Sequence, residues 1–381
     1  MEQDTNITSY TAAVLKDNNK RNILKCIYSL KRTTQPIVAQ NLNLSRPTVT
    51  QILKELTEEG YIEKEGYAQS TGGRKANVYA FDSSRKIAIG VELLIDRYEI
   101  IALDLYADMI KYEKKVLAFS HTEEYYEQVS NSVNKFIDSL HVSKESVLGV
   151  GIALQALISS DGQSIIYGKI LNCTGLHISQ FSKRISYKCI FNHDAESLAN
   201  TELWSDITIK DAIFFNIRDN LSGAVIIDGD FFRGGELKSG VFEHMTIVPD
   251  GRPCYCGKKG CVNSYCSISA FLNPGEDVDS FFQKVRTQKA EYIKRWEMYL
   301  ENLAMTIDNL HMFITSDVIL GGTLSKYLIS EDVDKLQTMV HKRSAFPSNE
   351  RYIKISRCAA FPLCHGAAIP LLNEYIKKIM G

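Results

Sequence analysis

The chain has 381 residues, a formal net charge of −1 and 45% hydrophobic residues, which suits two or three domains with buried cores. No apolar run approaches the ~20 residues of a membrane span, so a membrane-spanning protein is excluded. Nine cysteines are an odd number, which argues against a full disulfide framework. The polar start lacks the basic-then-apolar order of a signal peptide, and we expect a cytoplasmic location.

Charge is spread unevenly along the chain. Residues 1–80 hold 11 Lys and Arg against 8 Asp and Glu, whereas the remainder holds 33 against 37. A mildly basic head on an acidic body is compatible with DNA contact by the head.

The head is predicted to contain three helices. Residues 1–20 are polar and are expected to form a frayed lead-in, followed by a first helix over residues 23–30. A second helix begins near Pro36, and Ser45 caps a third. The third helix has one buried apolar stripe, and its opposite face is polar. The candidate DNA contacts on this face are Arg46, Thr48, Thr50, Gln51 and Lys54.

A predicted β-hairpin follows these helices. Residues 61–66 and 77–81 are expected to be strands joined by a glycine-rich basic loop. Arg74 and Lys75 at its tip are candidate contacts to phosphates or to a minor groove. Together the elements predict a winged helix-turn-helix, in which the third helix enters the major groove of double-stranded DNA. The alternative is a three-helix surface module whose polar face is only solvated.

The body alternates predicted strands and helices. Strands are expected at residues 86–92, 97–104, 112–119, 146–153 and 188–192, and helices at 124–140, at 290–310 and from His365 onward. Asp194 follows the fifth of these strands, at the end where open α/β sheets place their ligands.

The segment from His244 to Cys261 predicts a metal site. Its spacing is His-x9-Cys-x-Cys-x4-Cys, with ligands His244, Cys254, Cys256 and Cys261. Three thiols and one imidazole suit a closed tetrahedral zinc ion with a structural role. Two alternatives are a cluster of free or disulfide-bonded cysteines, and an all-cysteine site in which Cys266 replaces His244.

These residues carry a resemblance. Glu243-His244-Met-Thr and the following Cys-x-Cys-Gly-x-x-Gly-Cys, together with the head, resemble the ROK family of bacterial sugar kinases and sugar-responsive repressors. The resemblance implies an α/β, actin-like (ribonuclease-H-like) two-lobed sugar-kinase fold behind the head at residues 1–81. The first lobe would comprise residues 82–200 plus about 362–381. The second, residues 201–361, would carry the zinc loop and the dimerisation surface.

The same resemblance implies a ligand site. Asn172 matches the Asn of the family's sugar loop, Asp194 matches the catalytic base, and His244 matches a His that binds both zinc and sugar. Three departures weaken the match. Val241 stands where the family has a sugar-contacting Glu, and Asn263 replaces a second Glu. Asn192 and His193 replace the Glu and Asn that flank the catalytic base in the family. A site that lacks these acceptors is expected to bind sugar weakly, or to bind another ligand.

The motifs that bind ATP in the family's kinases are only partly present in this chain. Residues 92–96 lack the Gly and Thr of the family's first phosphate loop, and residues 218–224 place Asp219 where a triphosphate would lie. Gly321-Gly322 survives on the adenosine side. We therefore expect that phosphotransfer is lost, that the chain is not an enzyme, and that Asp194 is a vestigial base.

The sequence predicts a transcriptional regulator, specifically a repressor of carbohydrate-utilisation genes. Its expected partners are double-stranded operator DNA, a sugar effector and further copies of the chain in a homodimer or tetramer, with no membrane. Two alternatives remain: an active sugar kinase with a DNA-binding head, and a regulator without a small-molecule ligand.

Overall fold

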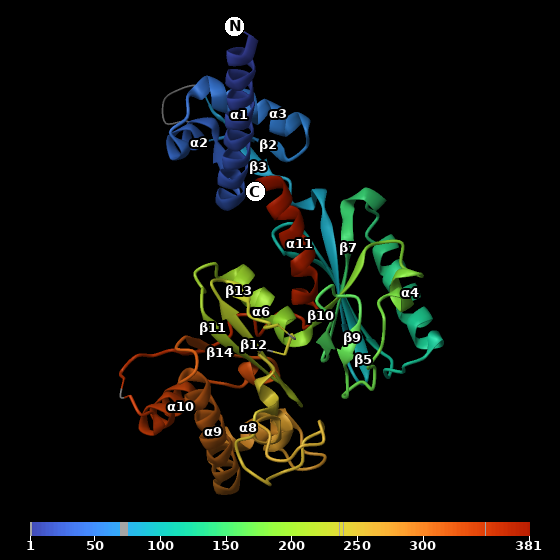
Figure 1. Ribbon diagram of the computed structural model, residues 1–381, viewed down its shortest axis with the longest axis vertical. Coiled ribbons are helices and arrows are strands. Elements are labelled where there is room, and N and C mark those ends of the chain that lie inside the picture. The colour runs from blue at the N-terminus through green and yellow to red at the C-terminus, as the bar shows by residue number, and fades with distance from the viewer. Residues whose placement is uncertain (1, 69–74, 236, 239, 347) are drawn as a thin grey trace.

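The computed structural model describes the chain apart from residues 1, 69–74, 236, 239 and 347. A helical head lies at one end of the molecule, and two lobes, each built on a five-stranded sheet, lie below it (Figure 1). The C-terminal helix runs from the head into the body.

The head is a three-helix domain with a small sheet in the order β1-β3-β2. Its elements are α1 (Glu2–Leu30), β1 (Arg32–Thr34), α2 (Gln35–Leu42), α3 (Arg46–Glu58), β2 (Ile62–Tyr67) and β3 (Asn77–Phe81). The expectation of a frayed lead-in over residues 1–20 is wrong, since α1 begins at Glu2. Lys16 lies 2.7 Å from Glu55 and Lys20 lies 2.5 Å from Glu59, so ion pairs hold α1 along α3.

The turn between α2 and α3 follows from local sequence. Asn43 adopts a left-handed conformation (φ 54°) and ends α2. Ser45 caps α3, because its side chain accepts a hydrogen bond from the Thr48 backbone N–H at 3.3 Å. The predicted stripe of Val49, Ile52, Leu53 and Leu56 is confirmed as buried.

The first lobe has a sheet in the order β10-β7-β4-β5-β6. Its elements are β4 (Ile87–Leu93), β5 (Arg97–Leu103), β6 (Met109–Val116), α4 (Glu123–Asp138), β7 (Val147–Leu154), β8 (Leu157–Ile158), β9 (Ile165–Tyr167), α5 (Ser179–Ser182) and β10 (Cys189–His193). β6 begins three residues earlier than predicted, because residues 109–111 already pair with β5.

The second lobe has a sheet in the order β13-β12-β11-β14-β15. Its strands are β11 (Ala212–Ile217), β12 (Leu221–Ile227), β13 (Asp230–Phe231), β14 (Asp317–Gly321) and β15 (Ile353–Ile355). Its helices are α7 (Asn263–Cys266), α8 (Val278–Arg286), α9 (Ala290–His311) and α10 (Ser330–Arg343).

Two helices fill the space between the sheets. α11 (His365–Met380) lies against β4 and β7, and α6 (Asp194–Ser205) lies against α11. The packing is close enough to require glycine. A Cβ at Gly151 would lie 1.9 Å from the Ala367 carbonyl oxygen, and one at Gly366 would lie 1.5 Å from that of Ser197.

The head is docked on the body through aromatic side chains. The Tyr28 hydroxyl of α1 donates to the Leu105 carbonyl oxygen at 2.8 Å, and its ring packs against those of Phe81 and Tyr106. Trp204, near the end of α6, donates its indole N–H to the Tyr106 carbonyl oxygen at 3.0 Å. One buried cluster therefore contains both head and body residues.

Candidate functional sites

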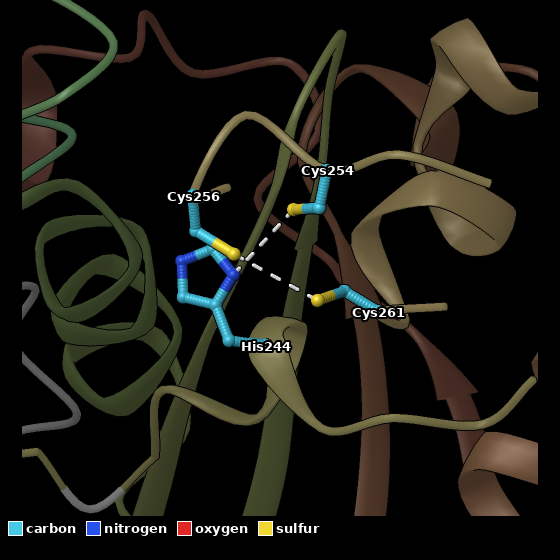
Figure 2. Close-up of side chains that lie close together, drawn as sticks. All are labelled: His244, Cys254, Cys256 and Cys261. Atoms are coloured by element: carbon cyan, nitrogen blue, oxygen red, sulfur yellow. Dashed lines mark hydrogen bonds between the residues drawn. The ribbon is translucent and has the colours of Figure 1, made fainter. Parts of the chain in front are cut away.

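The first candidate site is a cluster of one histidine and three cysteines. His244 ends a single helical turn, η3 (Phe242–His244), and the cysteines come from the loop before α7. Figure 2 shows the four side chains converging on one point. The ligand atoms of His244, Cys254, Cys256 and Cys261 all lie within 4.8 Å of one another.

The geometry of this cluster suits a tetrahedral metal ion. The His244 Nδ1 lies 3.7 Å from the Cys254 Sγ, and the Cys256 Sγ lies 3.8 Å from the Cys261 Sγ. Zinc–sulfur bonds of about 2.3 Å in a tetrahedron separate two sulfurs by about 3.8 Å. All nine cysteines are free, so of the alternative of free or disulfide-bonded cysteines only free thiols remain. The cluster could therefore hold a metal.

The loop that carries the cysteines needs its glycines. Gly257 and Gly260 both have positive φ, at 94° and 79°. A Cβ at Gly260 would lie 1.8 Å from the Val248 carbonyl oxygen, so the chain folds back too closely for any side chain.

Cys266 is separate from the cluster. It is fully buried, and its Sγ lies 3.5 Å from the Thr306 Oγ1. Burial raises the pKa of this thiol to about 12, as expected of a structural core residue. The all-cysteine alternative is therefore not supported by the structure.

The second candidate site is the outer face of α3. Arg46, Thr50, Gln51 and Lys54 are exposed, as a DNA-reading helix requires. Thr48 is half-buried, and its hydroxyl lies 2.7 Å from that of Ser45. It therefore takes part in the helix cap. In the hairpin loop, Lys75 is exposed, whereas Arg74 lies outside the described residues.

The third candidate site surrounds Asp194, which begins α6 and is only 1% exposed. Its Oδ2 accepts hydrogen bonds from the Asn216 side-chain amide at 2.9 Å and the Ser222 hydroxyl at 3.1 Å. Within the described chain its Oδ1 has no hydrogen-bond partner, although the His193 Nε2 lies 3.7 Å away.

An arginine also reaches this carboxylate. The Arg218 Nη1 lies 3.7 Å from the Asp194 Oδ2 and donates to the Glu92 Oε1 at 2.6 Å. Burial raises the pKa of Glu92 to about 7, and the charge of Arg218 opposes that shift. One guanidinium thus joins a first-lobe carboxylate to the start of α6. The sequence analysis missed this role; the available signal was an arginine beside the second phosphate loop.

The fourth candidate site is a cavity of about 510 Å³ between the lobes. Residues 155–170 of the first lobe form one wall, and residues of the metal loop, including His244 and Tyr255, form the other. Neither of the other two residues predicted to bind sugar is among the described residues that line it. Asn172 is exposed in a left-handed turn (φ 48°), and Asp194 is buried beside Arg218.

Asn263, one of the departures from the sugar-site pattern, has a structural role. Its side-chain oxygen accepts a hydrogen bond from the Leu221 backbone N–H at 2.7 Å, and it is 6% exposed. It therefore anchors the metal loop to the start of β12.

Residues 88–356 match the ROK family. The chain belongs to the ROK family. Residues 16–63 match a winged helix-turn-helix DNA-binding domain, which confirms the predicted head. A DNA-binding head on a ROK body is the arrangement of a transcriptional regulator.

Two curated ROK relatives are similar over much of the chain. The xylose repressor of Caldicellulosiruptor bescii is 22% identical over 355 residues, covering 87% of this chain and 89% of the relative. The transcriptional dual regulator NagC of Escherichia coli K12 is 24% identical over 261 residues, covering 68% and 64%.

Solved structures confirm the predicted fold. A ROK family transcriptional regulator, a homolog of the E. coli MLC protein, has a TM-score of 0.75 at 15% identity and covers 96% of this chain and 98% of its own. A ROK glucokinase from Streptomyces griseus, solved with glucose and AMPPNP, has a TM-score of 0.63 at 17% identity and covers 74% and 98%. Among the described residues, no helix is both long and apolar enough to span a bilayer.

Proposed function

We propose that the protein is a repressor of carbohydrate-utilisation genes. The observation that carries the proposal is the exposed polar face of α3, presented by a winged head that is docked on a ROK body. The relatives named as a xylose repressor and as NagC support the same role. In this role α3 enters the major groove and Arg46 and Gln51 reach base edges, while Lys54 and Lys75 contact phosphates.

The metal cluster is proposed to hold a structural zinc ion through His244, Cys254, Cys256 and Cys261. Four protein ligands close the coordination sphere, which leaves no position for a reacting water. Its contribution would be to fix the loop whose residues form one wall of the interlobe cavity.

The interlobe cavity is proposed to bind the effector, a sugar or sugar derivative. Because the two walls belong to different lobes, a ligand there would favour one lobe arrangement over another. α6 begins at Asp194, and near its other end Trp204 donates a hydrogen bond to Tyr106. The Tyr106 ring packs against Tyr28 of α1, so a movement of the lobes would be transmitted to α1. The ligand changes DNA affinity only by its differential affinity for the two arrangements.

Phosphotransfer is proposed to be absent. The Asp194 Oδ2 is held by Asn216, Ser222 and Arg218, and the two loops that bind phosphate in the kinases lack the residues that this binding needs. The kinase alternative would return if the purified protein showed sugar-dependent ATP turnover that disappeared in Asp194→Asn.

The deciding experiment is fluorescence anisotropy on the DNA upstream of the protein's own gene, with an unrelated duplex as control. We expect a preference of at least ~10³-fold for the upstream DNA. Gln51→Ala should weaken that binding by ~1–3 kcal/mol and relax specificity at one position. Gln128→Ala, on the far-removed helix α4, is the matched control and should bind as the wild type does. Equal, salt-sensitive binding to both duplexes would count against the proposal.

A further inference from the structure

The interlobe cavity has a predominantly apolar wall. Leu157, Ile166 and Ile170 line it from the first lobe, and Val241 lines it from the second. Two aromatic side chains, Tyr167 and Tyr255, complete this surface. Ile166 is 48% exposed, so its side chain is accessible to a ligand in the cavity.

Acceptor groups for the hydroxyls of a bare sugar are scarce there, because the polar side chains that line the cavity, among them Lys169, His193 and Lys238, are mainly donors. A sugar carries several hydroxyls, each of which requires a hydrogen-bond partner when it is buried. Asp194 is 1% exposed and is not among the described residues that line the cavity, and position 241 offers only a valine side chain. The Gln155 side-chain amide already donates to the Leu221 carbonyl oxygen at 3.0 Å.

The accessible charge at this cavity is positive. Lys169 from the first lobe and Lys258 from the metal loop both line it and are exposed. The carboxylate that lines it within the described chain, Glu243, is only 3% exposed. Ammonium groups on opposite walls of an apolar cavity attract an anion more strongly than they would in open water, because the apolar wall lowers the local dielectric.

We propose that this cavity binds an organic anion with an aromatic or branched apolar body, such as a sugar derivative with an aryl or acyl group and a carboxylate, sulfonate or phosphate. The inference rests on the proposed effector site and names its ligand class. The apolar body would cover Ile166, Ile170 and Val241, and the anionic group would lie between Lys169 and Lys258. A neutral, unsubstituted sugar would leave hydroxyls unpaired against this wall.

A matched pair of fluorescent probes tests the proposal on the full-length protein. 8-Anilinonaphthalene-1-sulfonate and N-phenyl-1-naphthylamine share one aromatic body, and only the first carries a negative charge. We expect saturable 1:1 binding of the sulfonate, at least about fivefold tighter than binding of the neutral amine. Lys169→Ala should remove most of that difference and leave the neutral probe unaffected. Lys135→Ala, on the exposed face of α4, is the matched control and should change neither probe.

A second variant tests whether the probe binds at the apolar wall of the cavity. Val241→Glu puts a carboxylate into the apolar wall and should weaken the sulfonate by about tenfold or more. Wild-type melting temperatures in both variants would show that the fold is retained. The proposal is overturned if the two probes bind equally, if Lys169→Ala or Val241→Glu binds the sulfonate as the wild type does, or if glucose, xylose or N-acetylglucosamine displaces it at micromolar concentration.

Operator binding is read separately, by anisotropy without any probe. If operator preference is present while the probes fail these tests, only the ligand class is wrong. If the probes behave as expected while no operator preference is found, the repressor proposal is wrong and the chemistry of the cavity stands.

Discussion

At the scale of single residues, Arg218 connects two buried carboxylates, those of Glu92 and Asp194. Its guanidinium lies between Glu92 and Asp194, both 1% exposed. Buried carboxylates are costly unless a cation or hydrogen bonds compensate them. Arg218, from the second lobe, therefore stabilises two first-lobe carboxylates that would otherwise repel each other.

Arg218→Met should destabilise the protein by about 3 kcal/mol at pH 7, because it leaves two buried carboxylates without a cation. The loss should shrink as the pH falls toward 5. The pKa of Glu92 is already raised to about 7, so the folded state takes up a proton as the pH falls through that value. Urea unfolding at both pH values measures this. Arg351→Met is the control, since its partner Asp334 is a surface residue and the loss should stay below about 1 kcal/mol.

A second residue-scale prediction concerns acid stability. Arg295 donates two hydrogen bonds of 2.9 Å to Glu276 and lowers the pKa of that carboxyl to about 2. The pair therefore contributes stability above the unfolded pKa of 4.5, and this contribution is lost as the pH falls toward 2. Glu276→Gln should lower the melting temperature at pH 7 and have little effect near pH 2. An equal shift at both values would contradict the pairing.

At the scale of elements, the metal loop and α6 connect the cavity to the rest of the protein. The loop folds back through Gly257 and Gly260 and places His244 and Tyr255 at the cavity. α6 spans from the Asp194 cluster to Trp204 below the head. The metal loop therefore lies at the interlobe cavity, and α6 begins at the Asp194 cluster and ends beside the head.

Cys261→Ser should release the proposed zinc, because it removes one of four ligands. Zinc per chain, measured with a chromophoric chelator after unfolding, should fall from about one to near zero, and the melting temperature should fall with it. Cys358→Ser is the control, since this buried thiol lies 3.4 Å from the Ser205 hydroxyl and far from the cluster. An unchanged metal content in Cys261→Ser would refute the ligand set.

Trp204→Phe keeps an aromatic ring and removes the N–H that bonds to Tyr106. Loss of about 1 kcal/mol at this contact should speed hydrogen exchange at the C-terminal end of α1 about fivefold. Trp296→Phe is the control, since it removes an indole N–H that donates to the Asp332 carboxylate in the second lobe and should leave exchange in α1 unchanged. Equal hydrogen exchange of α1 in the two variants would show that the Trp204 contact does not stabilise the head.

At the scale of the whole molecule, the head and body form one unit. The buried cluster that contains Ile23 and Ile27 of α1 continues into Ile101, Leu103 and Ile369 of the body. The head is therefore positioned by the body, and in a proposed homodimer or tetramer two heads would have a defined separation.

A fixed separation predicts a palindromic operator with half-sites a whole number of helical turns apart. Inserting about 5 base pairs between the half-sites should abolish tight binding, because it rotates one half-site to the opposite face of the duplex. Inserting about 10 base pairs returns both half-sites to the same face of the duplex. This duplex therefore distinguishes an effect of rotation from an effect of the longer distance. Anisotropy on the three duplexes gives the answer, and equal affinities would mean that the heads bind independently.

The sequence by itself determined the features that depend on short spacing. The metal ligands fall within one segment, and the turn before α3 follows from Asn43 and Ser45, so neighbouring residues were enough to predict both. The buried stripe of α3 follows from helical periodicity in the same way. The head and the ROK body were predicted from such local motifs and are confirmed.

Only the tertiary structure decided the features that join distant segments. The Arg218 cluster brings together Glu92, Asp194 and Arg218 from three parts of the chain, and local pattern gives no information about that contact. The ion pairs of Lys16 and Lys20 with Glu55 and Glu59 join α1 to residues about 39 positions away, which the polar sequence of α1 could not show. The chemistry of the cavity likewise depends on which side chains two lobes turn toward each other, because burial and charge there are set by packing and not by sequence spacing.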